Sequence, residues 1–249
     1  MCSLVVKMKV DVSSLQDSEG KIINWATNPI GRYVCVSNVH MCMEVFDSPE
    51  YAKIVNGSDL TVADGKPIVW AQHLLGYTSS QQVRGTDLTL SLCASAEKNN
   101  ISIGFYGATD ELLSKLNSKL KDKFPELKVA YSFSPPFRPL TKEEDSKYVE
   151  AINLSGVQIL FVALGCPKQE KWMAEHKNSV HCVTLGVGAA FDFIAGEKRH
   201  APKWIQFIGF EWLYRLMDEP GRLWKRYLKH NPRFMFYFIL QLLGKKSFD

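Results

Sequence analysis

The sequence lacks the short motifs that identify several large enzyme classes. It contains no P-loop of the form G-x-x-x-x-G-K-[ST], no H-E-x-x-H zinc motif and no G-x-S-x-G nucleophile motif. Acidic residues spaced as D-x-D or E-x-D, the usual metal clamp for a nucleoside diphosphate, occur only in Glu143-Glu144-Asp145 at an expected helix start. We therefore exclude P-loop ATPases, zincins and α/β-hydrolases, and we expect neither a metal site nor a cofactor.

Paired cysteines are also missing. None of the six cysteines forms a C-x-x-C pair, and no cluster of His and Cys has the spacing of zinc ligands. Cys35 and Cys182 lie inside apolar runs and are expected to be small core residues. We expect reduced thiols and a cytosolic protein.

Targeting segments and membrane-length apolar runs are absent as well. Met1 to Ser14 has no long apolar core with a small-residue cleavage site, so we expect no signal peptide. The run Phe234–Leu243 is apolar except for Gln241, but a span needs about 20 residues. With 46% hydrophobic and 22% charged residues, the 249-residue chain has the composition of a globular protein with a core.

Positive charges outnumber negative charges only at the C-terminal end of the chain. Residues 198–249 hold eleven Lys and Arg against four Asp and Glu, whereas the preceding residues hold 19 against 22. This asymmetry indicates an anionic partner for the last fifth of the chain: a membrane surface, a phosphate-bearing substrate or nucleic acid. The overall charge of +4 is too small to predict nucleic-acid binding.

Strand-like and helix-like segments alternate along the chain. The expected strands are Tyr33–Val39, Leu60–Ala63, Ile101–Tyr106, Val129–Phe133, Val157–Leu164 and Val180–Val187. The expected helices are Met41–Phe46, Lys66–Leu75, Glu111–Phe124, one from a capping box at Thr141 to about Leu154, and one from Pro167 to about Asn178. This order predicts an α/β, Rossmann-like fold with a mostly parallel sheet and helices on both faces. We expect a catalytic domain over 1–201 and a helical, basic and aromatic appendage over 202–249.

Ligands of parallel sheets bind beyond the carboxyl ends of the strands, so polar residues there are candidates for the site. Asp64 follows the strand Leu60–Ala63, where a carboxylate could act as a general base. It could equally cap the helix that begins at Lys66.

Two glycine-rich turns follow the most buried strands. After Gly165, Lys168 could contact a phosphate and Gln169 a hydroxyl, although an ordinary strand-to-helix turn has the same features. Gly186 and Gly188 form an incomplete G-x-G-x-x-G motif, which is weak support for a dinucleotide but indicates close approach of a ligand. We expect Asp192 to have a local role.

Arginines form the other group of candidates. Arg84 precedes a helix that we expect Thr86 or Asp87 to cap, leaving its guanidinium for an anion or a carboxylate. Arg215, Arg222 and Arg226 could grip a diphosphate, or they could form a solvated basic face.

Six of these blocks occur in a recognisable order. They are Val36-Ser37-Asn38, Ala63-Asp64-Gly65, Arg84-Gly85-Thr86-Asp87, F-V-A-L-G-C-P-K-Q-E at 161–170, Gly186-Val187-Gly188 and Glu211-Trp212-Leu213-Tyr214-Arg215. Together they resemble the WecG/TagA/CpsF family of bacterial glycosyltransferases over roughly Tyr33 to Tyr227. The P-K-Q-E and E-W-L-Y-R blocks are specific, whereas the glycine pairs are not.

The resemblance implies an inverting, metal-independent enzyme that moves a hexose or N-acetylhexosamine-type sugar from a UDP donor. The implied acceptor is a polyprenyl-diphosphate-linked saccharide on the cytoplasmic leaflet, and the products are teichoic acid, common antigen, capsule or another exopolysaccharide.

The resemblance also assigns residues. Asp64 matches the general base, Asn38, Arg84 and Gln169 match pocket residues, and Arg215 and Arg222 fall in an appendage that closes over the site. We count Glu211, in the same block as Arg215, among the expected substrate-binding residues. One departure is visible, because the family's Arg-Ala-Pro reads His200-Ala201-Pro202 here, with Arg199 one place earlier. Either Arg199 replaces the family's arginine, or His200 makes that contact when it is protonated.

The C-terminal segment suits a peripheral membrane contact on the inner face of the cell membrane. Phe234–Leu243, flanked by Arg233, Lys245 and Lys246, is typical of a helix lying in the membrane interface, where each basic residue contributes about 1 kcal/mol. Trp204, Trp212, Tyr214, Trp224, Tyr227 and Tyr237 suit the same depth. Alternatively, the aromatics pack on the catalytic domain or bury a homo-oligomer interface.

Two rival functions fit parts of the sequence. The first is a non-catalytic module that binds a nucleotide sugar or polyprenyl phosphate within an assembly complex. The second is a nicotinamide-dependent oxidoreductase, based on Gly186–Phe191.

Overall fold

The computed structural model describes residues 1–207 and 209–244. Its centre is a six-stranded sheet with the order β4-β3-β8-β7-β5-β6, in which every pairing is parallel. The strands are β3 (Arg32–Ser37), β4 (Leu60–Ala63), β5 (Ile103–Gly107), β6 (Val129–Phe133), β7 (Ile159–Ala163) and β8 (Val183–Gly186). A separate antiparallel hairpin precedes them, β1 (Cys2–Val5) and β2 (Met8–Asp11). The predicted parallel α/β fold is thus confirmed.

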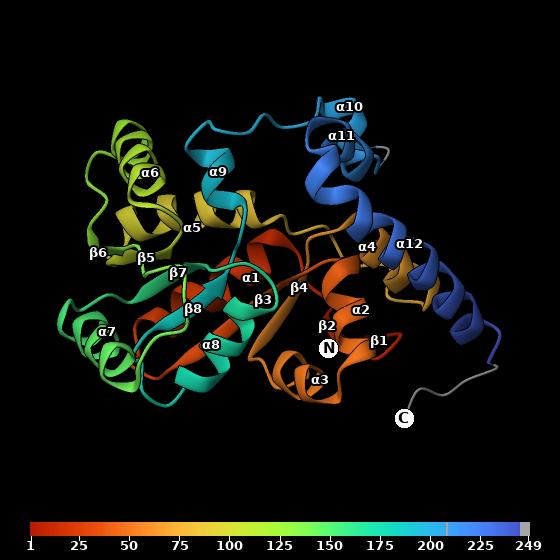
Figure 1. Ribbon diagram of the computed structural model, residues 1–249, viewed down its shortest axis with the longest axis horizontal. Coiled ribbons are helices and arrows are strands. Elements are labelled where there is room, and N and C mark those ends of the chain that lie inside the picture. Colours follow the sequence, from red (N-terminus) through yellow and green to blue (C-terminus); the bar gives the residue numbers. More distant parts are fainter. Residues whose placement is uncertain (208, 245–249) are drawn as a thin grey trace.

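Helices cover both faces of the sheet (Figure 1). One face carries α1 (Leu15–Ala26), α5 (Gly85–Lys98), α6 (Asp110–Lys123) and α9 (Ala190–Ile194). The other carries α2 (Val39–Asp47), α3 (Pro49–Asn56), α4 (Lys66–Leu74), α7 (Lys142–Leu154) and α8 (Lys168–His176). The capping box predicted at Thr141 is present, with reciprocal bonds to Glu144.

The core follows from the alternation of side chains along the central strands. In β7, Ile159 and Phe161 face one hydrophobic cluster, and Leu160 and Val162 face the other. Since both faces are buried, the strand reads as a continuous apolar run. Cys35 and Cys182 are buried in the core, as predicted, and all six cysteines are free thiols.

The chain then leaves the sheet for three helices, α10 (Lys203–Phe207), α11 (Glu211–Asp218) and α12 (Pro220–Leu242). In Figure 1 they lie beyond the β4 edge of the sheet, with α12 running along α2. The basic segment Arg222–His230 and the apolar segment Phe234–Leu243 form one continuous helix, with Pro232 inside it. Within the described ranges, none of the helices combines the length and the apolar character that crossing a bilayer requires.

The appendage is seated on the rest of the protein by its inner face. Phe234 and Phe238 are buried, and Tyr237 stacks on Phe46 with ring centroids 4.1 Å apart. Gln241, the polar exception in the apolar run, accepts a hydrogen bond from the backbone N–H of Val6 and donates one to the backbone oxygen of Leu4, both at 2.8 Å. The alternative that C-terminal aromatics pack on the domain therefore holds for this inner face.

Candidate functional site

Two adjoining cavities open at the carboxyl ends of the central strands. We call one the strand-end cavity; it is lined by the turns after β7 and β8, including Gly165, Gln169, Gly186 and Gly188. We call the other the appendage cavity; it lies between the start of α4 and helices α11 and α12, against Lys66, Trp212 and Tyr227. The residues that line both are Asn38, His40, Asp64, Glu211, Arg215 and Arg226.

Asp64 lies at the junction of the two cavities and is partly buried. Its Oδ1 accepts a hydrogen bond from the backbone N–H of Gly85 at 3.2 Å. Burial and the negative charge of Glu211 raise the pKa of Asp64 to about 6, against the lowering effect of Arg215, the Gly85 N–H and Arg84. A carboxylate with this pKa is ionised at neutral pH and still basic enough to take a proton.

The rival role of Asp64 as a helix cap does not hold. The N-cap of α4 is Gly65, and no side chain caps that helix. The backbone oxygen of Asp64 is instead occupied by the side-chain amide of Gln82. The hydrogen bond from the backbone N–H of Gly85 in α5 therefore holds the Asp64 carboxylate in place, and the residue lines both cavities.

Arg84 links the sheet to the appendage. Its Nε donates to Glu211 Oε2 at 3.3 Å, and its Nη1 lies 3.4 Å from Asp87 Oδ2. Arg84 itself occupies the N-cap position of α5, so the prediction that Thr86 or Asp87 caps this helix is wrong. The pairing with Glu211 joins two residues that lie 127 positions apart in the sequence.

Three further arginines line the strand-end cavity, Arg215, Arg222 and Arg226. The guanidinium of Arg215 lies 5.4 Å from the ring centroid of Phe193, and its Nε is buried without a partner among the described residues. Arg222 pairs with Glu219, and burial lowers the pKa of Arg226. Since ionised arginines concentrate at one wall, the cavity suits an anion.

Asn38 has a structural task as well as its place on both cavities. It is the N-cap of α2, and its Oδ1 accepts from the backbone N–H of Met41 at 3.2 Å. Its amide nitrogen and the second lone pair of Oδ1 remain available to a ligand.

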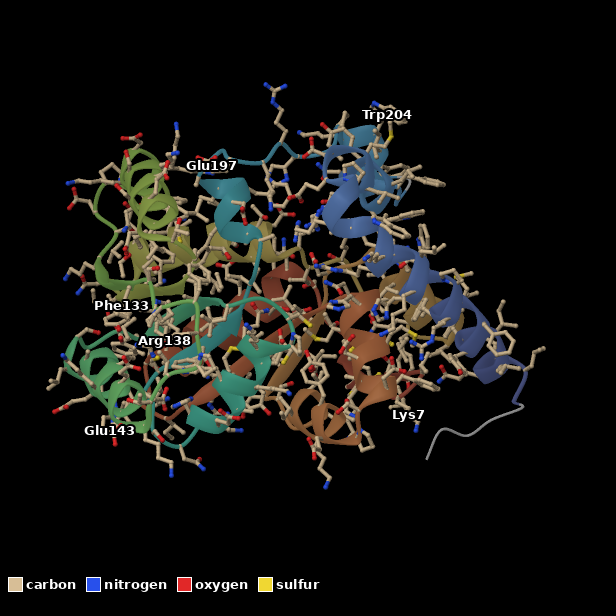
Figure 2. The ribbon with its side chains drawn as sticks, viewed as in Figure 1. Lys7, Phe133, Arg138, Glu143, Glu197 and Trp204 are labelled. Carbon is tan, nitrogen blue, oxygen red and sulfur yellow. The ribbon has the colours of Figure 1, made fainter. Side chains whose placement is uncertain are left out.

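Lys168 is the predicted site residue that the structure separates from the others. It lines a third cavity, with Tyr106, Lys171 and Trp172, beyond the ends of β5 and β7. Arg138 lines the same cavity, and Figure 2 places it on the side of the sheet away from α12. Asp192, for which we expected a local role, pairs with Lys198 at 3.2 Å.

Several residues of the cavities were not recognised as site residues from the sequence. Trp212 and Tyr227, which we expected at the membrane interface, line the appendage cavity with their ring centroids 5.8 Å apart. His200 lines the strand-end cavity and stacks on Phe193, whereas Arg199 lines neither cavity. Of the two residues that could replace the arginine of the family's Arg-Ala-Pro, His200 is therefore the one that lines the strand-end cavity.

One group of potential metal ligands occurs in the described part of the chain. Atoms of His40, Glu44 and His230 lie within 4.8 Å of one another. Burial and the positive charges of Arg226, His230 and Lys229 lower the pKa of His40 to about 4. The permanent cations Arg226 and Lys229 act on His40 and would repel a metal ion, so we assign no metal to this group.

The sequence matches the glycosyl transferase WecG/TagA/CpsF family over residues 3–248. The chain therefore belongs to this family of glycosyltransferases, as its motifs predicted.

Three relatives share the name N-acetylglucosaminyldiphosphoundecaprenol N-acetyl-β-D-mannosaminyltransferase. The protein from Staphylococcus aureus (strain MW2) is 30% identical over 217 residues, which is 86% of this chain and 81% of the relative. That from Bacillus spizizenii is 27% identical over 199 residues, 80% of this chain and 75% of the relative. That from Bacillus subtilis (strain 168) is 26% identical over 220 residues, 88% and 83% of the two chains.

Proposed function

We propose that the protein is an inverting, metal-independent glycosyltransferase that uses a UDP-sugar and a polyprenyl-diphosphate-linked saccharide. The observation that carries the proposal is Asp64, a carboxylate with a pKa of about 6 at the junction of two cavities. The names of the relatives support a lipid-diphosphate acceptor and an N-acetylhexosamine as the sugar. The product enters cell-surface polysaccharide, such as teichoic acid, capsule, common antigen or exopolysaccharide.

In this proposal the strand-end cavity takes the donor and the appendage cavity takes the acceptor. The acceptor hydroxyl attacks the anomeric carbon from the face opposite UDP while Asp64 accepts the hydroxyl proton. The new bond joins that oxygen to the anomeric carbon, and the bond from the anomeric carbon to the diphosphate oxygen breaks. UDP leaves with the electron pair, and Asp64 then releases its proton to water.

The leaving diphosphate needs positive charge in the strand-end cavity. Arg215, Arg222 and Arg226 line that cavity and supply it in place of a metal ion. Arg84, held by Glu211, lies on the same wall. Such fixed charges stabilise the departing group without reorganisation during the reaction.

The appendage also carries a surface suited to a membrane. Trp224, Leu228, Met235, Ile239 and Leu242 are exposed on α12 at spacings of three, four or seven residues, so they form one stripe along the helix. Trp204, Phe207 and Met217 extend the exposed apolar surface onto α10 and α11, and Figure 2 shows Trp204 at the outer edge of the molecule. Lys245 and Lys246, expected to add charge here, lie outside the described residues.

This outer stripe borders the face of α12 that carries the buried Phe234 and Phe238, and its own residues are exposed. The proposed docking surface is therefore the solvent side of α12, and the segment 202–249 acts as a docking appendage to the catalytic domain of 1–201. Docking from the cytoplasm onto the inner face of the membrane would bring the site to an acceptor that is confined to the lipid.

The test is turnover of a panel of UDP-sugars, including UDP-N-acetylmannosamine, on a short-chain polyprenyl-diphosphate-N-acetylglucosamine. We expect UDP release with one donor, without added metal, and a β-linked product from an α-configured donor. A retained configuration would contradict the single displacement. Tight binding of UDP-sugar with no transfer to the acceptor would instead support a non-catalytic module.

A further inference from the structure

A buried hydrogen-bonded chain runs from α3 to the wall of the strand-end cavity. The hydroxyl of Tyr51 donates to Glu170 Oε2 at 3.0 Å, and Gln169 Nε2 donates to Glu170 Oε1 at 2.7 Å. Tyr51, Glu170 and Gln169 are 2%, 0% and 4% exposed. Glu170 therefore uses one carboxylate oxygen to hold the amide of its neighbour and the other to anchor itself to α3.

This arrangement decides which way the amide of Gln169 points. Burial raises the pKa of Glu170, and the hydrogen bonds from Gln169 and Tyr51 act against this by favouring its ionised form. The ionised carboxylate offers only acceptors, so the nitrogen end of the amide faces Glu170. The carbonyl end, Oε1, is then turned away from Glu170; it is buried and has no hydrogen-bond partner among the described residues. A buried carbonyl oxygen without a partner is costly, which makes this atom a candidate for contact with a ligand.

Gly186, the last residue of β8, and Gly188, in the following turn, contact the amide from its other side. A Cβ at Gly186 would lie 2.9 Å from Gln169 Nε2 and 2.8 Å from Met173 Cε. One at Gly188, whose φ is +51°, would lie 3.6 Å from Gln169 Oε1. The turn is therefore shaped to the side chain of Gln169, and larger residues at Gly186 would displace it.

We propose that Glu170 is a positioning residue that fixes the amide of Gln169, and that Gln169 Oε1 accepts a hydrogen bond from a hydroxyl or amide N–H of the transferred sugar. The inference rests on the proposed function, in which this cavity holds the donor. Diphosphate oxygens have no hydrogen to donate, so Gln169 Oε1 contacts a hydroxyl or N–H group of the donor and not its diphosphate. Gln169 lines the strand-end cavity and not the appendage cavity, which favours the donor sugar over the acceptor sugar.

The experiment compares the affinities of UDP and UDP-N-acetylmannosamine by calorimetry, because their ratio isolates the contribution of the sugar. Gln169→Met removes the acceptor atom at nearly constant volume. We expect it to weaken UDP-N-acetylmannosamine about tenfold and to change the affinity for UDP less than twofold. Equal weakening of both ligands would assign Gln169 to the nucleotide, and an unchanged ratio would exclude the contact; either result overturns the proposal.

The role of Glu170 is tested by Glu170→Met alone and together with Gln169→Met. If Glu170 acts by orienting Gln169, the single change lowers the affinity ratio severalfold and has no further effect on the ratio in the Gln169→Met background. A merely structural role predicts equal weakening of both ligands, and additive effects in the double variant.

Tyr51→Phe serves as the matched control. It removes one donor to Glu170 and leaves the bond between Glu170 and Gln169, so the affinity ratio should stay within twofold of the wild type. A ratio that falls as far as in Gln169→Met would show that the bond from Gln169 to Glu170 does not hold the amide in place without the anchor on Tyr51, which would contradict the role assigned to this bond. If the wild type binds neither UDP nor UDP-sugars, the proposed function fails instead, before any variant is compared.

Discussion

Replacing Asp64 with asparagine separates catalysis from stability. In the wild type the carboxylate is partly buried near Glu211, which raises its pKa from 3.8 to about 6. Asp64→Asn keeps an oxygen that can accept from the N–H of Gly85 but cannot take a proton at neutral pH. We expect kcat to fall about 10²- to 10⁴-fold, the usual contribution of a general base.

The same substitution should stabilise the fold at high pH. The folded state holds the Asp64 proton more tightly than the unfolded chain, so stability from this group is full below about pH 4 and is lost as the pH rises through 6. The loss amounts to about 1 to 3 kcal/mol, since each pKa unit corresponds to about 1.4 kcal/mol and partial solvent access reduces the effect. Asp64→Asn should therefore be the more stable protein at pH 8 by that amount.

Urea unfolding at pH 4 and pH 8, together with UDP release, measures both effects. Asp122→Asn, an exposed aspartate in the last turn of α6, is the control and should change neither stability nor turnover. Equal stability of wild type and Asp64→Asn at both pH values would refute the assigned pKa. Transfer at the wild-type rate would refute the role as base.

Three other outcomes are expected. Met235→Glu with Ile239→Glu, on the exposed stripe of α12, should reduce co-sedimentation with anionic vesicles severalfold, whereas Leu154→Glu, at an even more exposed apolar residue on α7, should not; equal losses would argue against a specific docking surface. Excess EDTA should leave turnover unchanged, and a loss that Mg²⁺ restores would contradict a metal-independent mechanism. Phe161→Ala, which empties space beside Phe105, should lower the free energy of unfolding by about 3 to 5 kcal/mol in urea titration, and a loss below 1 kcal/mol would mean that the core closes around the change.

The periodic part of the fold could be predicted from the sequence. The strands β4 and β6 have the expected ends, and the capping box at Thr141 begins α7 as expected. The hairpin β1–β2 and the helix α1 were left unassigned because four-residue strands carry little pattern and the hydrophobic face of α1 is short. Their position depends on packing against distant elements.

The site was predictable only where position along a strand places a residue. Asp64, Gln169 and Gly186 meet because parallel strands end at one edge of the sheet. Lys168, next to Gln169 in sequence, lines another cavity because neighbouring positions on a helix point in different directions. The ion pair of Arg84 with Glu211 depends on how the appendage packs against the catalytic domain, and no local sequence pattern encodes that packing.

The hydrogen bonds between Gln241 and the β1–β2 hairpin have a consequence for the order in which the chain folds. Gln241 lies 237 positions after Leu4 and 235 after Val6, so these two bonds close longer loops than the ion pair of Arg233 with Asp47, which spans 186 positions. Because closing a long loop costs more conformational entropy than closing a short one, we expect these contacts to form after local ones. Before they form, Phe234 and Phe238 are exposed together with the outer stripe of α12, so the incompletely folded chain presents more apolar surface to lipid and to other chains than the folded protein does.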